Sequence, residues 1–487
     1  MLDNHETLKS RVISSIGWKL LEKGGSKIVS LLVQIVMARL LAPEEFGMLA
    51  IMLVFVNIGN VIVQSGLNTA LVQDPDVTER DYSTVFWLSL GISLALYVLL
   101  FWVAPFIATF YSQDELIWPL RVLGLILIIN AYNAVQIGKL TRDLEMKKIF
   151  LATIVSTVSS SILGIGSALL GVGVWALVVQ QVVYQLSNVI AHAVQIDWYP
   201  RQVFQVDRAK KLFVFGWKLL VSGILNAINQ SFASLVIGKQ FGGYQLGLVS
   251  QGEKYPAALG TMIDGAIQPV MLSAVSKVQN DIAYVRRLTR RALRTSTYFM
   301  FPVMFLCAVV APSLIPLLLG EQWADAVPFF QIYCIAYSLL PIHSINLQVL
   351  AGLGRSDLFL ALEILKVLIG VACVTVGAIV FNDIYCFMVA YLVASIVSSF
   401  INTVPNKKII RYSYTAQIRD IFPSILLAVG GSCCALLIAN FCTFDGIVLM
   451  LLQMMGFSLF YLGVSAAFQL EEFLYLVNGV TSHFKNE

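Results

Sequence analysis

Long apolar stretches separated by short polar segments run through almost the whole chain. A helix needs about 20 mostly apolar residues to cross the hydrocarbon core of a bilayer. This measure predicts about fourteen membrane spans. The expected spans are 16–41, 47–72, 83–110, 117–138, 149–171, 173–195, 212–238, 245–273, 296–319, 326–350, 358–380, 384–404, 420–441 and 446–468.

The two halves of the chain carry the same landmarks in the same order. The sequence GWKLL at 17–21 recurs at 216–220, and Gly47 is matched by Gly247. Six spans separate the two starts, so both halves enter the membrane in the same sense. Transporters built from such parallel repeats place their substrate at the interface between the repeats. Further matches join Ala104-Pro105 to Ala311-Pro312 and Pro119 to Pro328.

This repeat predicts the fold class and the domains. We expect an all-α integral membrane protein with two parallel six-helix repeats and two additional C-terminal helices. The predicted N-lobe is 1–200 and holds spans one to six. The predicted C-lobe is 201–405 and holds spans seven to twelve. Residues 406–487 are expected to add two spans and a cytoplasmic tail.

Composition excludes several other classes of protein. Of the 487 residues 58% are hydrophobic and 12% are charged, against about 25% charged in ordinary soluble domains. The mean hydropathy is +0.81. A net charge of +4 without clustering does not fit a nucleic-acid reader. The sequence contains no P-loop, HExxH or CxxC motif, so neither a metal site nor a catalytic site is predicted.

Basic residues indicate the orientation, because lysine and arginine are retained on the cytoplasmic side. With the N-terminus inside, most of the 32 Lys and Arg fall in cytoplasmic segments, and only Arg39 and Lys239 fall in external ones. An even number of spans then places both termini in the cytoplasm. The densest basic segment, 286–294, is expected on the cytoplasmic surface.

Lysines inside predicted spans are the main candidates for substrate binding, because charges there usually face a water-filled cavity or a partner. Several ammonium groups in one cleft suit a polyanion such as pyrophosphate. The alternative is that those near the membrane surface extend to the headgroups or pair with Glu22. The candidates are Lys19, Lys23, Lys27, Lys218 and Lys254.

Polar residues at helical spacing predict a wet interior that could accept hydroxyl-rich cargo. The alternative for each residue singly is hydrogen bonding between helices. The expected cavity-lining residues are Asn57, Asn60, Gln64, Gln181, Gln185, Asn188, Asn226 and Asn229. Candidate acids for coupling to H+ or Na+ are Glu22, Glu253 and Asp264, with structural pairing as the alternative for Asp264.

Several motifs together resemble a known family. They are GWK at 17–19, MARLLAPEEFG at 37–47, DYSTVFW at 81–87, GVWALV at 173–178 and GRSDLF at 354–359. The chain is similar to the polysaccharide transporter branch, the Wzx type of colanic-acid flippases, in the multidrug/oligosaccharidyl-lipid/polysaccharide exporter superfamily. The likeness extends over essentially the whole chain.

The resemblance implies a V-shaped pair of six-helix lobes in a bacterial cytoplasmic (inner) membrane. It implies a flippase that moves undecaprenyl-pyrophosphate-linked oligosaccharide to the outer leaflet by alternating access. The five lysines would hold the pyrophosphate in a cationic cavity. Implied partners are this lipid-linked substrate, membrane lipids and polysaccharide polymerase machinery, without nucleic acid and without a bound cofactor.

Two other functions remain open from the residues alone. A cation-coupled drug exporter of the same superfamily would favour acidic residues over lysines in its cavity. A membrane glycosyltransferase or polymerase usually carries a sizeable external domain, whereas the expected external loops at 111–116, 320–325 and 381–383 are very short.

Overall fold

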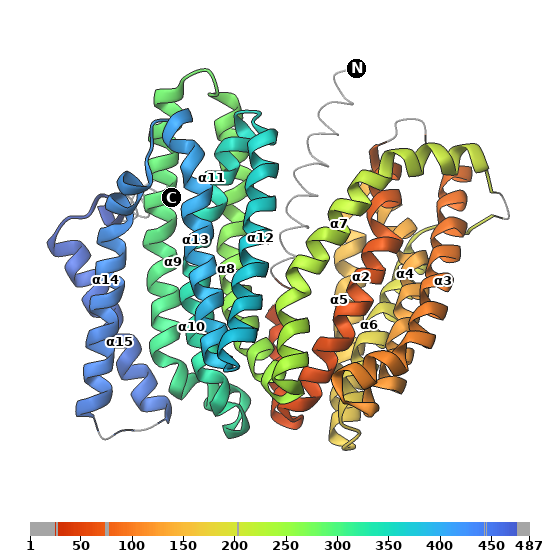
Figure 1. Cartoon of the computed structure of the whole chain (residues 1–487), viewed down its shortest axis with the longest axis horizontal. Coiled ribbons are helices and arrows are strands. Elements are labelled where there is room, and N and C mark those ends of the chain that lie inside the picture. The colour runs from red at the N-terminus through yellow and green to blue at the C-terminus, as the bar shows by residue number, and fades with distance from the viewer. Residues whose placement is uncertain are drawn as a thin grey trace, which may run out of the picture. The chain divides into compact units, whose positions relative to one another are not determined.

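The computed structural model describes residues 25, 28–73, 77–201, 204–442, 444 and 446–474, with the backbone alone at 65–70, 72–73, 211–216, 218–219, 378–379 and 381. Within this part of the chain the regular structure is helical. The helices are α2 (Pro43–Gln73), α3 (Glu79–Tyr111), α4 (Ile117–Arg142), α5 (Met146–Leu169), α6 (Val174–Gln195), α7 (Val206–Gln240), α8 (Gly242–Lys277), α9 (Ile282–Leu319), α10 (Val327–Ser338), α11 (Leu340–Gly352), α12 (Ser356–Phe381), α13 (Ile384–Ile409), α14 (Tyr414–Phe441) and α15 (Gly446–Ala467), with short 3-10 helices η1 (Asp114–Leu116) and η2 (Glu321–Ala326) (Figure 1).

The described helices confirm the all-α membrane fold. Among the described residues, thirteen helical segments are long and apolar enough to cross a membrane. A shorter apolar helix, Ile28–Leu40, lies within the first predicted span, 16–41. The earlier part of that span lies outside the described residues.

Helix α9 begins well before the predicted span 296–319, because a hydropathy criterion overlooks an amphipathic extension. The Asp281 side chain accepts a hydrogen bond from the Tyr284 amide at 2.9 Å and caps the helix. Val285, Thr289 and Leu293 then form a fully buried stripe at helical spacing. At about 1.5 Å per residue the helix exceeds a hydrocarbon core of about 30 Å, so its basic first turns extend beyond that core.

The predicted span 326–350 is interrupted at Leu339, where α10 ends and α11 begins. Pro341 occupies the first turn of α11. Proline has no backbone N–H, and it therefore fits the start of a helix better than its interior. The two helices together cover the predicted span.

Contacts along the chain divide it into two compact units, unit 1 (Met1–Gly247) and unit 2 (Leu248–Glu487). In unit 1, α7 packs along α2 (Figure 1). The helix that opens the second sequence repeat therefore belongs to the first compact unit. Compactness and sequence repetition are different criteria, so the predicted boundaries at 200 and 405 stay a prediction.

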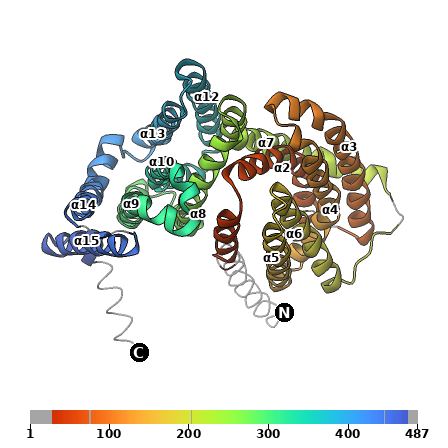
Figure 2. The ribbon, with the colours of Figure 1, turned by 90° about the horizontal axis from the view of Figure 1, so that it is seen from below.

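Each unit has its own apolar core. In unit 1 the rings of Tyr82 and Phe86, in the first turns of α3, pack edge to face against the Trp198 ring. In unit 2 the last two helices, α14 and α15, pack on α9 (Figure 2). The Tyr461 hydroxyl donates to the Tyr298 carbonyl at 2.8 Å inside this core. The two C-terminal helices are thus an integral part of unit 2.

Two glycines that the sequence repeat makes equivalent contact one another. A Cβ on Gly47 would lie 1.9 Å from the Gly243 carbonyl oxygen. A Cβ on Gly247 would lie 1.9 Å from the Pro43 carbonyl oxygen and 3.2 Å from the Gly47 nitrogen. Only residues without a side chain allow α2 and the first turns of α8 to approach this closely.

Each unit contains a bidentate ion pair between corresponding helices, with the positions of the two charges exchanged. In unit 1, Arg208 on α7 donates to both carboxylate oxygens of Asp81 on α3, each at 2.7 Å. In unit 2, Arg290 on α9 donates to both oxygens of Asp420 on α14, at 2.7 and 2.6 Å. Helix α9 follows α8 as α3 follows α2, and α14 follows α13 as α7 follows α6. The pairs therefore occupy related places in the repeat.

A histidine–asparagine hydrogen bond is repeated in the same exchanged manner. His192 on α6 contacts Asn133 on α4 at 3.0 Å. Asn402 on α13 contacts His343 on α11 at 3.3 Å. The two pairs are separated by the same sequence offset of 210 residues, from 133 to 343 and from 192 to 402. The asparagine and the histidine are exchanged between them. This matched geometry supports the predicted repeat.

Candidate functional site

Polar side chains are exposed on the membrane-crossing surface of α2 and α7 in unit 1. Asn57 on α2 and Asn226 and Asn229 on α7 are exposed. Very little of the membrane-crossing stretch Leu220–Gln240 is buried inside the protein. Exposed amides are costly in hydrocarbon, where no water satisfies them. This part of the surface therefore requires water or a polar ligand.

Apolar residues on α7 mark a second, neighbouring face. Leu225 is 63% exposed and Ile228 is 41% exposed. Each precedes an exposed asparagine by one position, so the apolar and polar side chains form adjacent stripes along the helix. An apolar stripe beside an amide stripe is what a helix at the border between lipid and water presents.

Other residues of the predicted polar stripes point into unit 1. Asn130 on α4 donates to the Asn60 side chain at 2.9 Å, and Asn188 on α6 is buried. For Asn60 the structure thus shows the alternative, hydrogen bonding between helices. Gln64, Gln181 and Gln185 are half-buried.

Of the five predicted lysines, the structure describes the side chain of Lys254 alone. Lys19, Lys23 and Lys27, together with Glu22, lie outside the described residues. The backbone of Lys218 lies in α7, and its side chain is outside the described part. Lys254 lies in α8 and is half-buried. Among the described residues no carboxylate pairs with its ammonium group.

Glu253, next to Lys254, is enclosed by tyrosines from α10 and α13. The Tyr337 hydroxyl donates to Glu253 Oε1 at 2.8 Å. The Tyr333 ring contacts the rings of Tyr337 and Tyr391, with centroids 6.2 and 5.3 Å away. The partners of this carboxylate are therefore neutral hydroxyls.

Asp264, about three turns further along α8, is also held by neutral donors. The Ser344 hydroxyl on α11 donates to one carboxylate oxygen, and the Gln268 amide donates to the other at 2.6 Å. Asp264 is 5% exposed. Of the described residues, no cation pairs with either acid of α8. The sequence predicted both acids, and their neutral hydrogen-bond partners come from the tertiary structure.

Buried amides join three helices of unit 2. Asn346 on α11 donates to Gln417 on α14 at 2.9 Å, and Asn406 on α13 donates to Asn346 at 2.6 Å. All three side chains are at most 1% exposed. Complete burial makes this amide cluster a structural link between α11, α13 and α14.

The end of α9 that carries the arginines is tied to neighbouring elements. Arg294 pairs with Glu471 at 2.8 Å and with Glu472 at 2.5 Å. The Tyr412 hydroxyl donates to Asp420 at 2.8 Å, on the same carboxylate that binds Arg290. Burial, and then the hydrogen bond to Asp420, raise the pKa of the Tyr412 phenol. Part of the basic segment 286–294 is therefore structural.

Sequence reasoning did not predict a cavity at one end of unit 1. It has a volume of about 360 Å3 and is lined by residues of α2, η1, α4 and the turn before α6. Its charged lining residues are Glu45, Asp114 and Glu115, and its aromatic ones are Trp118 and Trp175. These residues come from three separate turns. Glu45, Gly173 and Trp175 lie in two of the family motifs, but the motifs do not show that the turns meet around a cavity.

Comparisons with known proteins agree with this architecture. A family model described as polysaccharide biosynthesis protein matches residues 36–328. The chain is 26% identical over 369 residues to the succinoglycan biosynthesis transport protein ExoT of Rhizobium meliloti, covering 76% of this chain and 74% of that protein. It is 19% identical over 377 residues to the lipopolysaccharide biosynthesis protein WzxC of Escherichia coli, covering 76% of each. A structure of the lipid II flippase MurJ, in an inward closed conformation, is similar with a TM-score of 0.76 and 13% identity, covering 93% of this chain and 98% of that chain.

The fold is polytopic and all-helical, and it is similar to that of MurJ over nearly the whole chain. The family model covers more than half of the sequence. The chain therefore belongs to the family of polysaccharide biosynthesis proteins. The resemblance found in the sequence motifs is confirmed at this level.

Proposed function

We propose that this protein is a flippase for undecaprenyl-pyrophosphate-linked oligosaccharide repeat units. It moves them from the cytoplasmic to the outer leaflet by alternating access, for the synthesis of surface polysaccharide, O-antigen or capsule. Family membership supports a role in polysaccharide biosynthesis. The observation that supports a role in transport is the row of exposed amides on α2 and α7.

The exposed amides would accompany the sugar across the membrane. Asn57, Asn226 and Asn229 each offer a donor and an acceptor, which match sugar hydroxyls. A passage that supplies such partners lowers the desolvation cost of moving an oligosaccharide through the bilayer. The half-buried Gln64, Gln181 and Gln185 stay proposed as secondary lining residues, and Asn60 and Asn188 are proposed to support them.

Lysines would bind the pyrophosphate. An ammonium within a membrane-crossing helix is costly unless an anion or water neutralises it, and Lys254 has no carboxylate partner in the described part of the chain. The pyrophosphate would supply that counter-charge. We propose that Lys19, Lys23, Lys27 and Lys218 contribute to the same anionic headgroup.

Acids held by neutral partners would couple transport to an ion gradient. Glu253 and Asp264 can take up a proton or a Na+ without first breaking an ion pair to a described cation. Glu22 is the third candidate. A pH gradient and a Na+ gradient, imposed separately on proteoliposomes, distinguish the two driving ions by which one accelerates flipping.

The proposed setting is the cytoplasmic (inner) membrane of a bacterium, with both termini in the cytoplasm. The partners are the lipid-linked substrate, the surrounding lipids and the polymerase machinery that uses the exported unit. The protein would act as a transporter and not as an enzyme. The sequence repeats 1–200 and 201–405 would form the two moving lobes, with 406–487 attached to the second.

Deleting the gene tests the proposal directly. We expect lipid-linked oligosaccharide to accumulate in the inner leaflet and surface polysaccharide to disappear. A strain that instead loses resistance to cationic drugs, with normal polysaccharide, would indicate a drug exporter. Glycosyl transfer by the purified protein would indicate an enzyme.

Lysine substitution tests the binding site. The double variant Lys27→Ala/Lys254→Ala should abolish export while the folded protein remains in the membrane. The matched control is Lys277→Ala, which removes an exposed ammonium from the end of α8. Normal export by the double variant would remove the lysines from the mechanism.

A further inference from the structure

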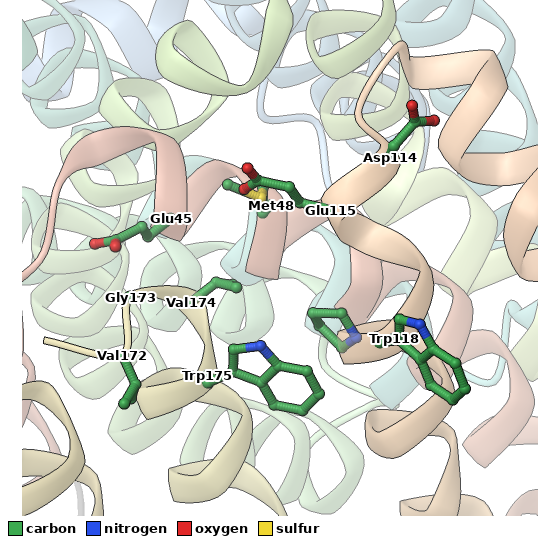
Figure 3. A pocket seen from close by; sticks show the side chains of 10 residues that line it. Glu45, Met48, Asp114, Glu115, Trp118, Val172, Gly173, Val174 and Trp175 are labelled. Carbon is green, nitrogen blue, oxygen red and sulfur yellow. The ribbon is translucent and has the colours of Figure 1, made fainter.

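The cavity at the end of unit 1 combines carboxylates with flat aromatic faces. Glu45 comes from α2, Asp114 and Glu115 from η1, Trp118 from α4 and Trp175 from α6. Figure 3 shows that Glu45, Trp175 and Trp118, which line the cavity, come from different helices. About 360 Å3 is at the small end of the range of about 300–1,000 Å3 for ligand pockets. The cavity therefore fits part of an oligosaccharide.

Gly173 keeps the space beside one carboxylate open. Glu45 Oε2 accepts a hydrogen bond from the Ala42 amide at 2.7 Å. Glu45 Oε1 lies 2.7 Å from the point that a Cβ on Gly173 would occupy, and Gly173 has a φ of +62°. A side chain at 173 would be strained and would crowd this oxygen. One carboxylate oxygen is thus committed to the backbone, and glycine leaves room at the other.

The charge balance favours a neutral ligand. Helices α2, α4 and α6 all begin at this end, and their N-termini carry positive partial charge. The three carboxylates offset that charge. In the described part of the chain no group of three or more His, Cys, Asp or Glu residues is arranged to hold a metal ion. Neither a metal cation nor an anion is therefore the ligand that this lining suits.

Sugar rings have the complementary chemistry. Their hydroxyls donate to carboxylates, which are strong acceptors. Their C–H faces are apolar, and the amphipathic indole offers a flat surface for them together with an N–H donor. The remaining lining residues include Met48 and Pro119, which add apolar surface.

We propose that this cavity binds a neutral sugar ring of the oligosaccharide on the outer side of the membrane. This inference rests on the proposed flippase function and on the orientation predicted from basic residues. The subsite receives the sugar after translocation. It therefore acts late in the transport cycle, whereas the lysines bind the pyrophosphate at its start. It gives the exported unit a first contact outside the bilayer.

Tryptophan also gathers at membrane interfaces without binding any ligand. The chain offers a matched control for that role, because Trp102 on α3 is 71% exposed and does not line the cavity. Glu44 is the corresponding control for Glu45, because it is an exposed carboxylate in the same helical turn.

Calorimetric titration of the purified full-length protein tests the subsite. The probe is a set of oligosaccharides released by mild acid from the surface polysaccharide of the same cells. Glu45→Gln should weaken binding about tenfold, the loss typical for a charged hydrogen bond. Trp175→Ala, which removes the flat indole surface, and Gly173→Ala, which crowds Glu45 Oε1, should weaken binding to a similar extent. Trp102→Ala and Glu44→Gln should change it less than about twofold. Glu45→Gln keeps an acceptor for the Ala42 amide, so it tests binding even if Gly173→Ala fails to fold.

Each result has one meaning. Loss of binding in the cavity variants alone supports the subsite. Absence of binding by the wild-type protein, or equal loss in the two control variants, overturns it. Accumulation of lipid-linked oligosaccharide in the deletion strain is scored separately, so the flippase function and the subsite can fail independently.

Discussion

Replacing Arg208 by glutamine should destabilise unit 1 by a measurable amount. Asp81 is fully buried, and the side chain of Arg208 is 25% exposed. The substitution removes two hydrogen bonds of 2.7 Å and leaves the carboxylate without its counter-charge. Thr78 continues to donate from its amide and its hydroxyl, each at 2.8 Å.

These contacts set the magnitude of the expected loss. Breaking a buried ion pair costs about 3–5 kcal/mol, whereas an exposed pair contributes about 0–1 kcal/mol. Because Arg208 is partly exposed and Thr78 still supports Asp81, we expect a loss of about 2 kcal/mol. At about 2–4 °C per kcal/mol for a domain of this size, the melting midpoint should fall by about 4–8 °C.

The chain contains separate reporters for its two units. Seven of the 8 tryptophans precede residue 248, whereas all 7 cysteines follow it. Intrinsic tryptophan fluorescence therefore reports mainly on unit 1, and a thiol-reactive dye reports on unit 2. Arg208→Gln should lower the fluorescence midpoint more than the dye midpoint.

A double-mutant cycle separates the ion pair from other effects. Asp81→Asn combined with Arg208→Gln should recover part of the loss, because no buried charge is then left unpaired. The control is Arg80→Gln, which removes an exposed arginine from the neighbouring position. If Arg208→Gln lowers the fluorescence midpoint no further than Arg80→Gln does, the reasoning from burial is refuted.

Three further outcomes follow from the packing. Gly47→Ala should lower the melting midpoint sharply, because its Cβ would lie 1.9 Å from the Gly243 carbonyl oxygen. The control Gly91→Ala has open space around it and should leave the midpoint equal or higher. Equal shifts in the two variants would contradict the close approach. The double variant Asn133→His/His192→Asn exchanges the two partners, and its fluorescence midpoint should fall less than that of His192→Leu, because the second repeat holds the exchanged pair. A double variant as unstable as His192→Leu would argue against the equivalence of the two pairs. Asp420→Asn should lower the thiol-dye midpoint of unit 2, because Arg290 and Tyr412 both lose a carboxylate partner. An unchanged midpoint would show that the Arg290–Asp420 pair contributes nothing to the stability of unit 2.

The position of the membrane helices could be read from sequence because the requirement is local. A segment must be about 20 apolar residues long to cross hydrocarbon, whatever its neighbours are. The predicted span 384–404 lies within α13, and 446–468 matches α15 to within one residue. The misses occur where an amphipathic or proline-containing helix departs from that rule, at the start of α9 and at Leu339.

The candidate site could be predicted only in part, because periodicity shows which residues share a face but not what that face meets. Asn57 and Asn60 are three positions apart on α2, yet Asn57 is exposed while Asn60 is bonded to Asn130. Glu253 was predicted as a coupling acid from its charge in a span, but its tyrosine partners lie about eighty positions further along the chain.

The sequence alone determined that this is a helical membrane protein with an internal repeat, and its motifs indicated the family. These features depend on local hydropathy and on residue order. Only the tertiary structure decided that the repeats exchange the partners of an ion pair and of a histidine–asparagine bond, and that three distant turns enclose a cavity of carboxylates and indoles. Such contacts depend on how helices far apart in sequence pack together, and no local pattern encodes that choice.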